Sequence, residues 1–171
     1  MRLQTAIARI RKYKPVTPTD FRWAGVPLEK EALGAGTFRE AVKVKDCPLI
    51  VKFPLSEEGN SSADIPDDYP PDFSLGIRHS ALEMKKITRL RRFKWMRRFL
   101  PEVYYYDRRH GIIVMRFYEE IKGAFGVANS KFVETLLKRC TGVFLTDYGE
   151  CNVGAGGTEA GPVPILLDLG Y

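Results

Sequence analysis

Cysteine and histidine are scarce in this chain of 171 residues. Its three cysteines, Cys47, Cys140 and Cys151, form no C-x-x-C pair, and an odd number without such a pair argues against a disulfide framework. The two histidines, His79 and His110, are isolated from each other and from the cysteines, which argues against a zinc site. A reduced, cytoplasmic setting is therefore the prediction.

Long hydrophobic runs are also absent. No apolar run approaches the length that spans a bilayer, and the first residues lack the apolar centre of a secretory signal. The hydrophobic content of 44% is ample for a core, so we expect a soluble chain of one domain, or of two small lobes around a cleft, without a membrane partner. Residues 2–13 predict an amphipathic helix that packs on the body; a membrane-surface helix is the weaker alternative.

The net charge of +6 is unevenly distributed. From Lys85 to Arg98 there are eight Lys or Arg residues and no acid, whereas residues 56–72 are acidic. Residues 56–76 predict a long surface loop. A helix is expected over residues 78–98. Its basic side is either a solvated face or a surface for an acidic partner or nucleic acid.

Oxygen-bearing side chains gather towards the end of the sequence. Asp147 and Asn152 have the spacing D-x-x-x-x-N, and Asp168 follows a Gly-rich turn and an apolar run over residues 164–167. A carboxylate buried without a partner costs several kcal/mol, roughly 2–7 for a polar group, so a cation should meet these side chains. Magnesium suits Asn152 and Asp168, leaving Asp147 to accept a proton. The alternative is a capping Asp and two turn residues.

A second glycine-rich stretch, Gly34-Ala35-Gly36, lies between two predicted strands. The strand before it covers residues 28–33, and Val42 and Val44 alternate with lysines after it. A dinucleotide-binding fingerprint needs a helix here, and a Walker A loop needs a following G-K-[ST]. The stretch therefore predicts either a flap that closes over phosphates or a plain hairpin.

Two charged residues are predicted on apolar elements. Lys52 is part of an apolar strand over residues 48–53, and Glu83 shares a helix face with Ile87 and Leu90. A carboxylate on a buried face needs a cation, and Lys52 is the candidate. The alternative is a lysine that reaches solvent from an edge strand.

Further elements follow the same logic. Residues 103–106 and 111–117 predict two strands joined by the turn 107–110, and residues 130–140 predict a helix that begins at a possible Ser cap.

The order of these features over about residues 28–170 resembles the protein-kinase-like superfamily: Gly flap, strand lysine, helix glutamate, D-x-x-x-x-N and D-x-G. The resemblance implies an α+β fold. Residues 1–120 would form an antiparallel-sheet N-lobe with one main helix, its flap, strands and helix lying in 28–119, and residues 121–171 a much reduced C-lobe. It also implies a minimal, C-terminally truncated Ser/Thr-kinase-like domain, since the sequence stops at Tyr171.

The resemblance implies ATP and Mg²⁺ as cofactors and assigns roles to the site residues. Lys52, held by Glu83, would orient the α and β phosphates, and Asp147 would accept the proton of the acceptor hydroxyl. The other implied site residues are the flap Gly34, Ala35 and Gly36, the gatekeeper Met115, a hinge for adenine over Arg116 to Tyr118 that includes Phe117, and the metal ligands Asn152 and Asp168.

The implied function is transfer of the γ-phosphate of ATP to a hydroxyl, most simply by a protein Ser/Thr kinase. Two alternatives stay open. One is a nucleotide-binding pseudokinase that acts through its basic helix, and the other is a small-molecule kinase similar to antibiotic or sugar kinases. The phosphate acceptor is accordingly a protein or a small molecule, and a second subunit could supply a missing wall of the site.

Overall fold

The computed structural model describes residues 1–35, 38–55, 73–120, 135, 138, 153–158 and 161–166. The chain divides into two compact units. The first consists of Met1–Ala81 and Glu102–Phe117, and the second of Leu82–Pro101 and Tyr118–Tyr171. The segment after Ala81 therefore groups with the C-terminal part of the chain rather than with the strands on either side of it.

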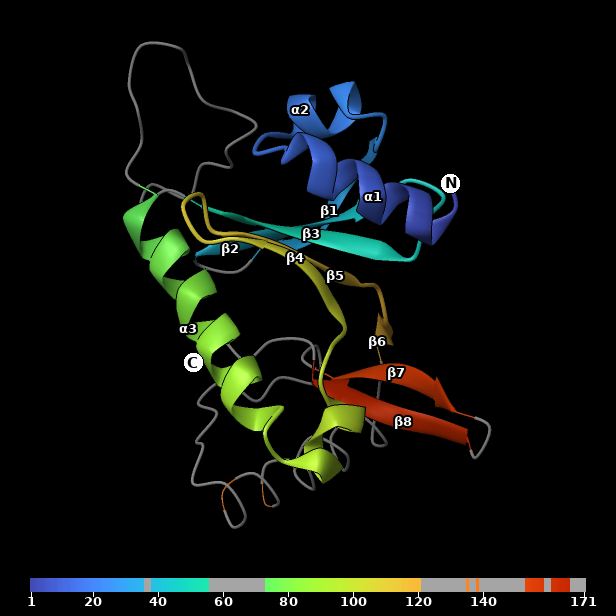
Figure 1. Ribbon diagram of the computed structural model, residues 1–171, viewed down its shortest axis with the longest axis vertical. Coiled ribbons are helices and arrows are strands. Elements are labelled where there is room, and N and C mark those ends of the chain that lie inside the picture. The colour runs from blue at the N-terminus through green and yellow to red at the C-terminus, as the bar shows by residue number, and fades with distance from the viewer. Residues whose placement is uncertain are drawn as a thin grey trace. The chain divides into compact units, whose positions relative to one another are not determined.

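A five-stranded antiparallel sheet with the order β1-β2-β3-β5-β4 organises the first unit (Figure 1). Its strands are β1 (Leu28–Ala35), β2 (Arg39–Val44), β3 (Leu49–Pro54), β4 (Val103–Asp107) and β5 (Ile112–Arg116). Strand β3 is central because it pairs with β2 on one side and β5 on the other. The predicted strands are confirmed, and the alternative that placed Lys52 on an edge strand is wrong.

Two helices, α1 (Leu3–Tyr13) and α2 (Pro18–Trp23), lie together on one face of this sheet (Figure 1). Helix α1 buries Ala6, Ile7 and Ile10 in the main core cluster, where they join Val51 and other residues of the strands. This confirms the predicted amphipathic helix. The apolar side of α1 is thus used inside the fold.

Helix α2 is an element that the sequence patterns did not predict. A capping box starts it: the Asp20 amide donates to Thr17 Oγ1 (3.1 Å), and the Thr17 amide donates to Asp20 Oδ2 (2.9 Å). Each side chain satisfies an amide that the first helical turn leaves without a partner. The spacing Thr-x-x-Asp followed by Phe21 was the available signal.

The helix predicted over residues 78–98 is wrong in its extent, and residues 74–76 of the predicted loop 56–76 belong to this helix. Helix α3 spans Ser74–Leu90, and a separate 3₁₀-helix, η1, spans Lys94–Phe99. Phe93 between them has extended backbone angles (φ −86°, ψ 111°), and its amide already bonds to Leu90 at i−3 (3.0 Å). The eight cations therefore do not lie on one helix.

Two of these cations stabilise the backbone of the second unit. Arg91 Nη2 donates to the Pro101 carbonyl (3.0 Å), and Arg97 Nε donates to the Arg91 carbonyl (2.8 Å). Both contacts satisfy carbonyl oxygens where the helical bonding pattern ends. The basic segment is thus partly structural, and its predicted role in binding an acidic partner or nucleic acid stays a prediction.

The second unit contains a small sheet with the order β6-β7-β8. Its strands are β6 (Glu119–Glu120), β7 (Val153–Thr158) and β8 (Gly161–Leu166). The stretch predicted as a Gly-rich turn is therefore a strand, β7, paired from Val153↔Leu166 to Thr158↔Gly161. Glycine is depleted in strands, so composition pointed to a turn. Of the predicted helix 130–140 the structure describes Thr135 and Lys138, which are helical.

Within the described ranges, no helix has both the length and the apolar character that crossing a membrane would require.

Candidate active site

Lys52 and the first glycine of the flap lie on one row across the sheet. The register pairs Gly34 with Ala41, Ala41 with Lys52, and Lys52 with Ile113. Directly opposite residues of paired strands project to the same face, and adjacent strands are about 4.8 Å apart. Two strand spacings, about 10 Å, therefore separate Gly34 from Lys52. The sheet brings together two parts of the predicted site that are 18 positions apart in the sequence.

Lys52 and Glu83 are buried, as the prediction requires. Their exposed fractions are 6% and 0%, and in the described part of the chain the only other buried polar side chain is Ser80. A buried charge is costly unless it is paired, and neither Lys52 nor Glu83 is without a partner. Glu83 shares its buried side of α3 with Ile87 and Leu90, both 0% exposed, which confirms the predicted helix face.

A second row of the sheet carries the predicted gatekeeper. Ile50 pairs with Lys43 on β2 and with Met115 on β5. Because side chains alternate along β3, Ile50 and Lys52 face the same side, and Met115 (0% exposed) shares that side. Leu49, Val51 and Phe53 face the helices α1 and α2 instead. The predicted pocket residues on the sheet therefore share the face away from those helices.

The predicted hinge is partly occupied by the sheet's own hydrogen bonds. The Phe117 amide donates to the Pro48 carbonyl (2.9 Å), and the Arg116 amide donates to the Glu102 carbonyl (2.9 Å). Lys43 Nζ lies 4.5 Å from the centre of the Phe117 ring. Neither of the two amides can donate to an adenine ring at the same time, so the predicted role of Phe117 rests on its carbonyl and its ring.

The base of the flap is attached to helix α3. The Phe38 carbonyl accepts the Leu55 amide (2.8 Å), and the Phe38 ring stacks on His79 at 4.1 Å and 4°. Gly76 allows this close approach, since a Cβ there would lie 2.7 Å from the Phe38 carbonyl oxygen. From the sequence His79 is an ordinary histidine, and no spacing or motif marks its contact with the flap. Of the flap itself, Gly34 and Ala35 end β1, and Gly36 lies outside the described residues.

The predicted proton acceptor Asp147 and metal ligands Asn152 and Asp168 lie outside the described residues. Their positions in the sequence are nevertheless informative. Asn152 directly precedes β7, Asp168 comes two residues after β8, and the strand ends they flank are paired through Val153 and Leu166.

Elsewhere in the described residues, no group of three or more His, Cys, Asp or Glu side chains is arranged to hold a metal ion. The predicted ligand pair, Asn152 and Asp168, stays a prediction. An amide oxygen and a carboxylate oxygen, completed by phosphate and water, fit the preference of this ion.

Comparisons with known proteins show similarity at the level of the fold. No family model matches the chain, and no curated protein matches it. Among solved structures, it is similar to the crystal structure of the Rio2 kinase–ADP/Mg²⁺–phosphoaspartate complex from Chaetomium thermophilum, with a TM-score of 0.50 and 16% sequence identity. The match covers 88% of this chain and 50% of that one, so this chain spans about half the length of that kinase. The likeness indicates a protein-kinase-like fold, and the five-stranded antiparallel sheet is consistent with a kinase-like N-lobe.

Proposed function

We propose that this chain is an ATP-dependent phosphotransferase, a minimal protein Ser/Thr kinase that transfers the γ-phosphate of Mg-ATP to a hydroxyl. The observation that carries the proposal is the placement of Lys52. It is 6% exposed, on the central strand, and on one row with Gly34 of the flap. A buried lysine on the central strand, in line with the flap, is where the phosphate-binding lysine of such a site is needed.

Catalysis of phosphoryl transfer consists mainly of positioning and charge neutralisation. Lys52 would hold the α and β phosphates from the sheet, and the backbone amides of the flap beginning at Gly34 would cover them. A partly buried ammonium group interacts more strongly with phosphate than an exposed one, because water screens it less. Ile50 and Met115 would contact the adenine ring, since both share the sheet face of Lys52.

The second unit would supply the remaining groups. Asn152 and Asp168, which flank the sequences of β7 and β8, would hold Mg²⁺, and the ion would supply positive charge that neutralises the phosphates. Asp147, five residues before Asn152, would orient the acceptor hydroxyl and take its proton. Glu83 would hold Lys52 in place. The pairing of these two residues stays a proposal.

The test is transfer of label from γ-labelled ATP in the presence of Mg²⁺, with the chain alone and with cell lysate. Asp147→Asn should reduce transfer by about a hundredfold or more while nucleotide binding is retained, as expected for loss of a general base. Lys52→Met should reduce both binding and transfer. The matched control is Lys45→Met, because Lys45 is exposed in the turn that follows β2.

The location of the label separates the proposal from its alternatives. Labelled protein supports a protein kinase, and label only in small molecules supports a small-molecule kinase. ATP binding without any transfer would leave a pseudokinase and contradict the proposal. Because the similar Rio2 kinase structure is a phosphoaspartate complex, label on this chain itself should also be treated with hydroxylamine. Hydroxylamine cleaves acyl phosphates and spares phosphoserine and phosphothreonine.

A further inference from the structure

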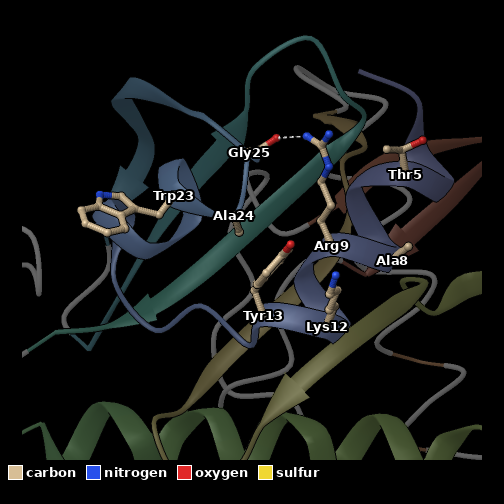
Figure 2. A pocket seen from close by; sticks show the side chains of 8 residues that line it. All are labelled: Thr5, Ala8, Arg9, Lys12, Tyr13, Trp23, Ala24 and Gly25. Atoms are coloured by element: carbon tan, nitrogen blue, oxygen red, sulfur yellow. Dashed lines mark hydrogen bonds between the residues drawn. The ribbon is translucent and has the colours of Figure 1, made fainter.

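An open groove lies between helices α1 and α2 (Figure 2). These helices pack on the sheet face that carries Val51, opposite the face of Lys52. Its volume is about 470 Å³, enough for one large side chain with its flanking backbone. Both helices contribute to its walls. The residues that line it are Thr5, Ala8, Arg9, Lys12, Tyr13, Trp23, Ala24 and Gly25.

Two aromatic rings of this groove are exposed to an unusual degree. Trp23 is 85% exposed and Tyr13 56% exposed, and in the described residues the only other exposed large hydrophobic side chains are Leu33 and Leu82. Figure 2 shows the Trp23 indole at one side of the groove, pointing outward, and the Tyr13 ring directed towards its centre. Single exposed hydrophobic residues are ordinary, but two aromatic rings beside one groove indicate an interaction surface.

The groove is cationic. Arg9 Nη1 donates to the Gly25 carbonyl (2.7 Å), which holds the guanidinium at the groove, and Lys12 Nζ lies 5.0 Å from the centre of the Tyr13 ring. Residues 1–25 contain six Lys or Arg and a single acid, Asp20. The Asp20 carboxylate accepts the amides of Val16 and Thr17, so its charge is used in capping α2.

We propose that this groove docks an acidic peptide segment of a partner protein. One aromatic or aliphatic side chain of the segment would pack between Tyr13 and Trp23, and its carboxylates would face Arg9 and Lys12. Trp, Tyr and Arg are the residue types most enriched at interface hot spots, and all three line this one groove. Carboxylates complement its charge.

Single-stranded nucleic acid suits the groove less well. Such ligands need a continuous line of cations along the phosphate backbone, in addition to rings on which bases stack. Only two cations, Arg9 and Lys12, line this groove. The groove is also separate from the proposed nucleotide face, so docking does not depend on phosphotransfer.

The test measures binding of peptides in which acidic residues surround one fixed tryptophan or leucine, against the same peptides with amides in place of the carboxylates. The protein carries Trp95→Phe when the leucine peptides are used, so that Trp23 is its only indole. Binding should shift Trp23 emission to the blue, and affinity should fall as salt increases. Trp23→Ala should weaken binding about thirtyfold, a hot-spot effect, and Lys12→Gln about threefold.

Matched controls make the outcome decisive. Leu33→Ala removes another exposed hydrophobic side chain and Lys45→Gln another exposed cation, and neither should change peptide affinity. Equal binding of the amide peptides, no binding of the acidic ones at low salt, or tighter binding of a uridine oligonucleotide through Trp23 would each overturn the proposal.

Discussion

The two faces of the five-stranded sheet are both buried, yet they differ in chemistry. The face under α1 and α2 holds the main hydrophobic core, with Leu49, Val51 and Phe53 of β3 in the core cluster. The opposite face of the same strand carries Ile50 and the ammonium group of Lys52. Because side chains alternate along β3, the core residues project to one face and the proposed phosphate-binding lysine to the other. Adjacent residues should therefore respond to substitution in different ways.

The largest loss of stability is expected from the apolar face. Phe53 is 1% exposed, and its ring packs edge-on against Phe21 of α2 at 5.7 Å. Phe53→Ala should lower the free energy of unfolding by about 3–5 kcal/mol, through lost burial and the cavity that remains. Chemical denaturation measures this. A loss below about 1 kcal/mol would mean that α2 does not pack on the sheet as described.

The opposite face should show coupling between charges instead. If Lys52 and Glu83 balance each other, Lys52→Met leaves a buried carboxylate without its cation and should cost about 3 kcal/mol. The double variant Lys52→Met/Glu83→Met should recover most of that stability while remaining inactive, because a buried ion pair is often no more stable than apolar residues of similar size. If the double variant instead lost as much stability as the two single variants together, the result would contradict the pairing.

Much of the sheet could be predicted from the sequence, because alternating apolar residues with turn residues between them report strands directly. Residues 103–106 and 111–117 were recognised in this way, as was the lysine within β3. The end of α3 was missed because basic residues are good helix formers, so residues 91–98 look helical by propensity. The extended backbone at Phe93 depends on local tertiary structure that propensity does not contain.

The candidate site also has features that the sequence predicts and features that it does not. The burial of Lys52 and Glu83 follows from the apolar pattern around each, which the sequence displays. The stacking of Phe38 on His79 and the occupied amide of Phe117 depend on contacts between segments far apart in the chain, and no local pattern encodes them. Strand β7 was not predicted because its glycines are typical of turns, and its strand conformation depends on pairing with β8.

Two glycines with positive φ allow a smaller comparison, between the α3 side and the α1–α2 side of the first unit. Gly111 (φ +69°) faces the backbone of α3, and a Cβ there would lie 2.9 Å from Ile77 Cα. Gly25 (φ +70°), on the side of α1 and α2, would instead meet the end of the Arg9 side chain at 2.5 Å. Both changes incur about 1 kcal/mol for the left-handed backbone, but only Arg9 can move aside.

Gly111→Ala should therefore lose about 2–3 kcal/mol and Gly25→Ala about 1 kcal/mol, as measured by thermal unfolding of both variants. Gly25→Ala should also weaken docking of the acidic peptide, because Arg9 loses its fixed position at the groove. Equal losses of stability at the two sites would show that the space around Gly111 is not as tight as the structure indicates.

The smallest expected effect is on the pH dependence of stability, through the carboxylate of Asp20. Burial raises the pKa of Asp20, but hydrogen bonds from the Thr17 side chain and from the Thr17 and Val16 amides outweigh it and hold the pKa below its usual value. A carboxyl whose pKa is lower in the folded state stabilises the fold above its unfolded pKa of about 4, and this contribution is lost as pH falls through the folded pKa.

Asp20→Asn should therefore lower stability at pH 7 by about 1 kcal/mol or less, the scale of a helix cap, and reduce the loss on acidification below about pH 4. The control Asp46→Asn replaces an exposed aspartate in the turn after β2, so it leaves the cap of α2 intact. If denaturation from pH 6 to pH 2 gave parallel curves for the parent and Asp20→Asn, the capping carboxylate would not stabilise α2, and the helical side of the sheet would owe its stability to apolar burial alone.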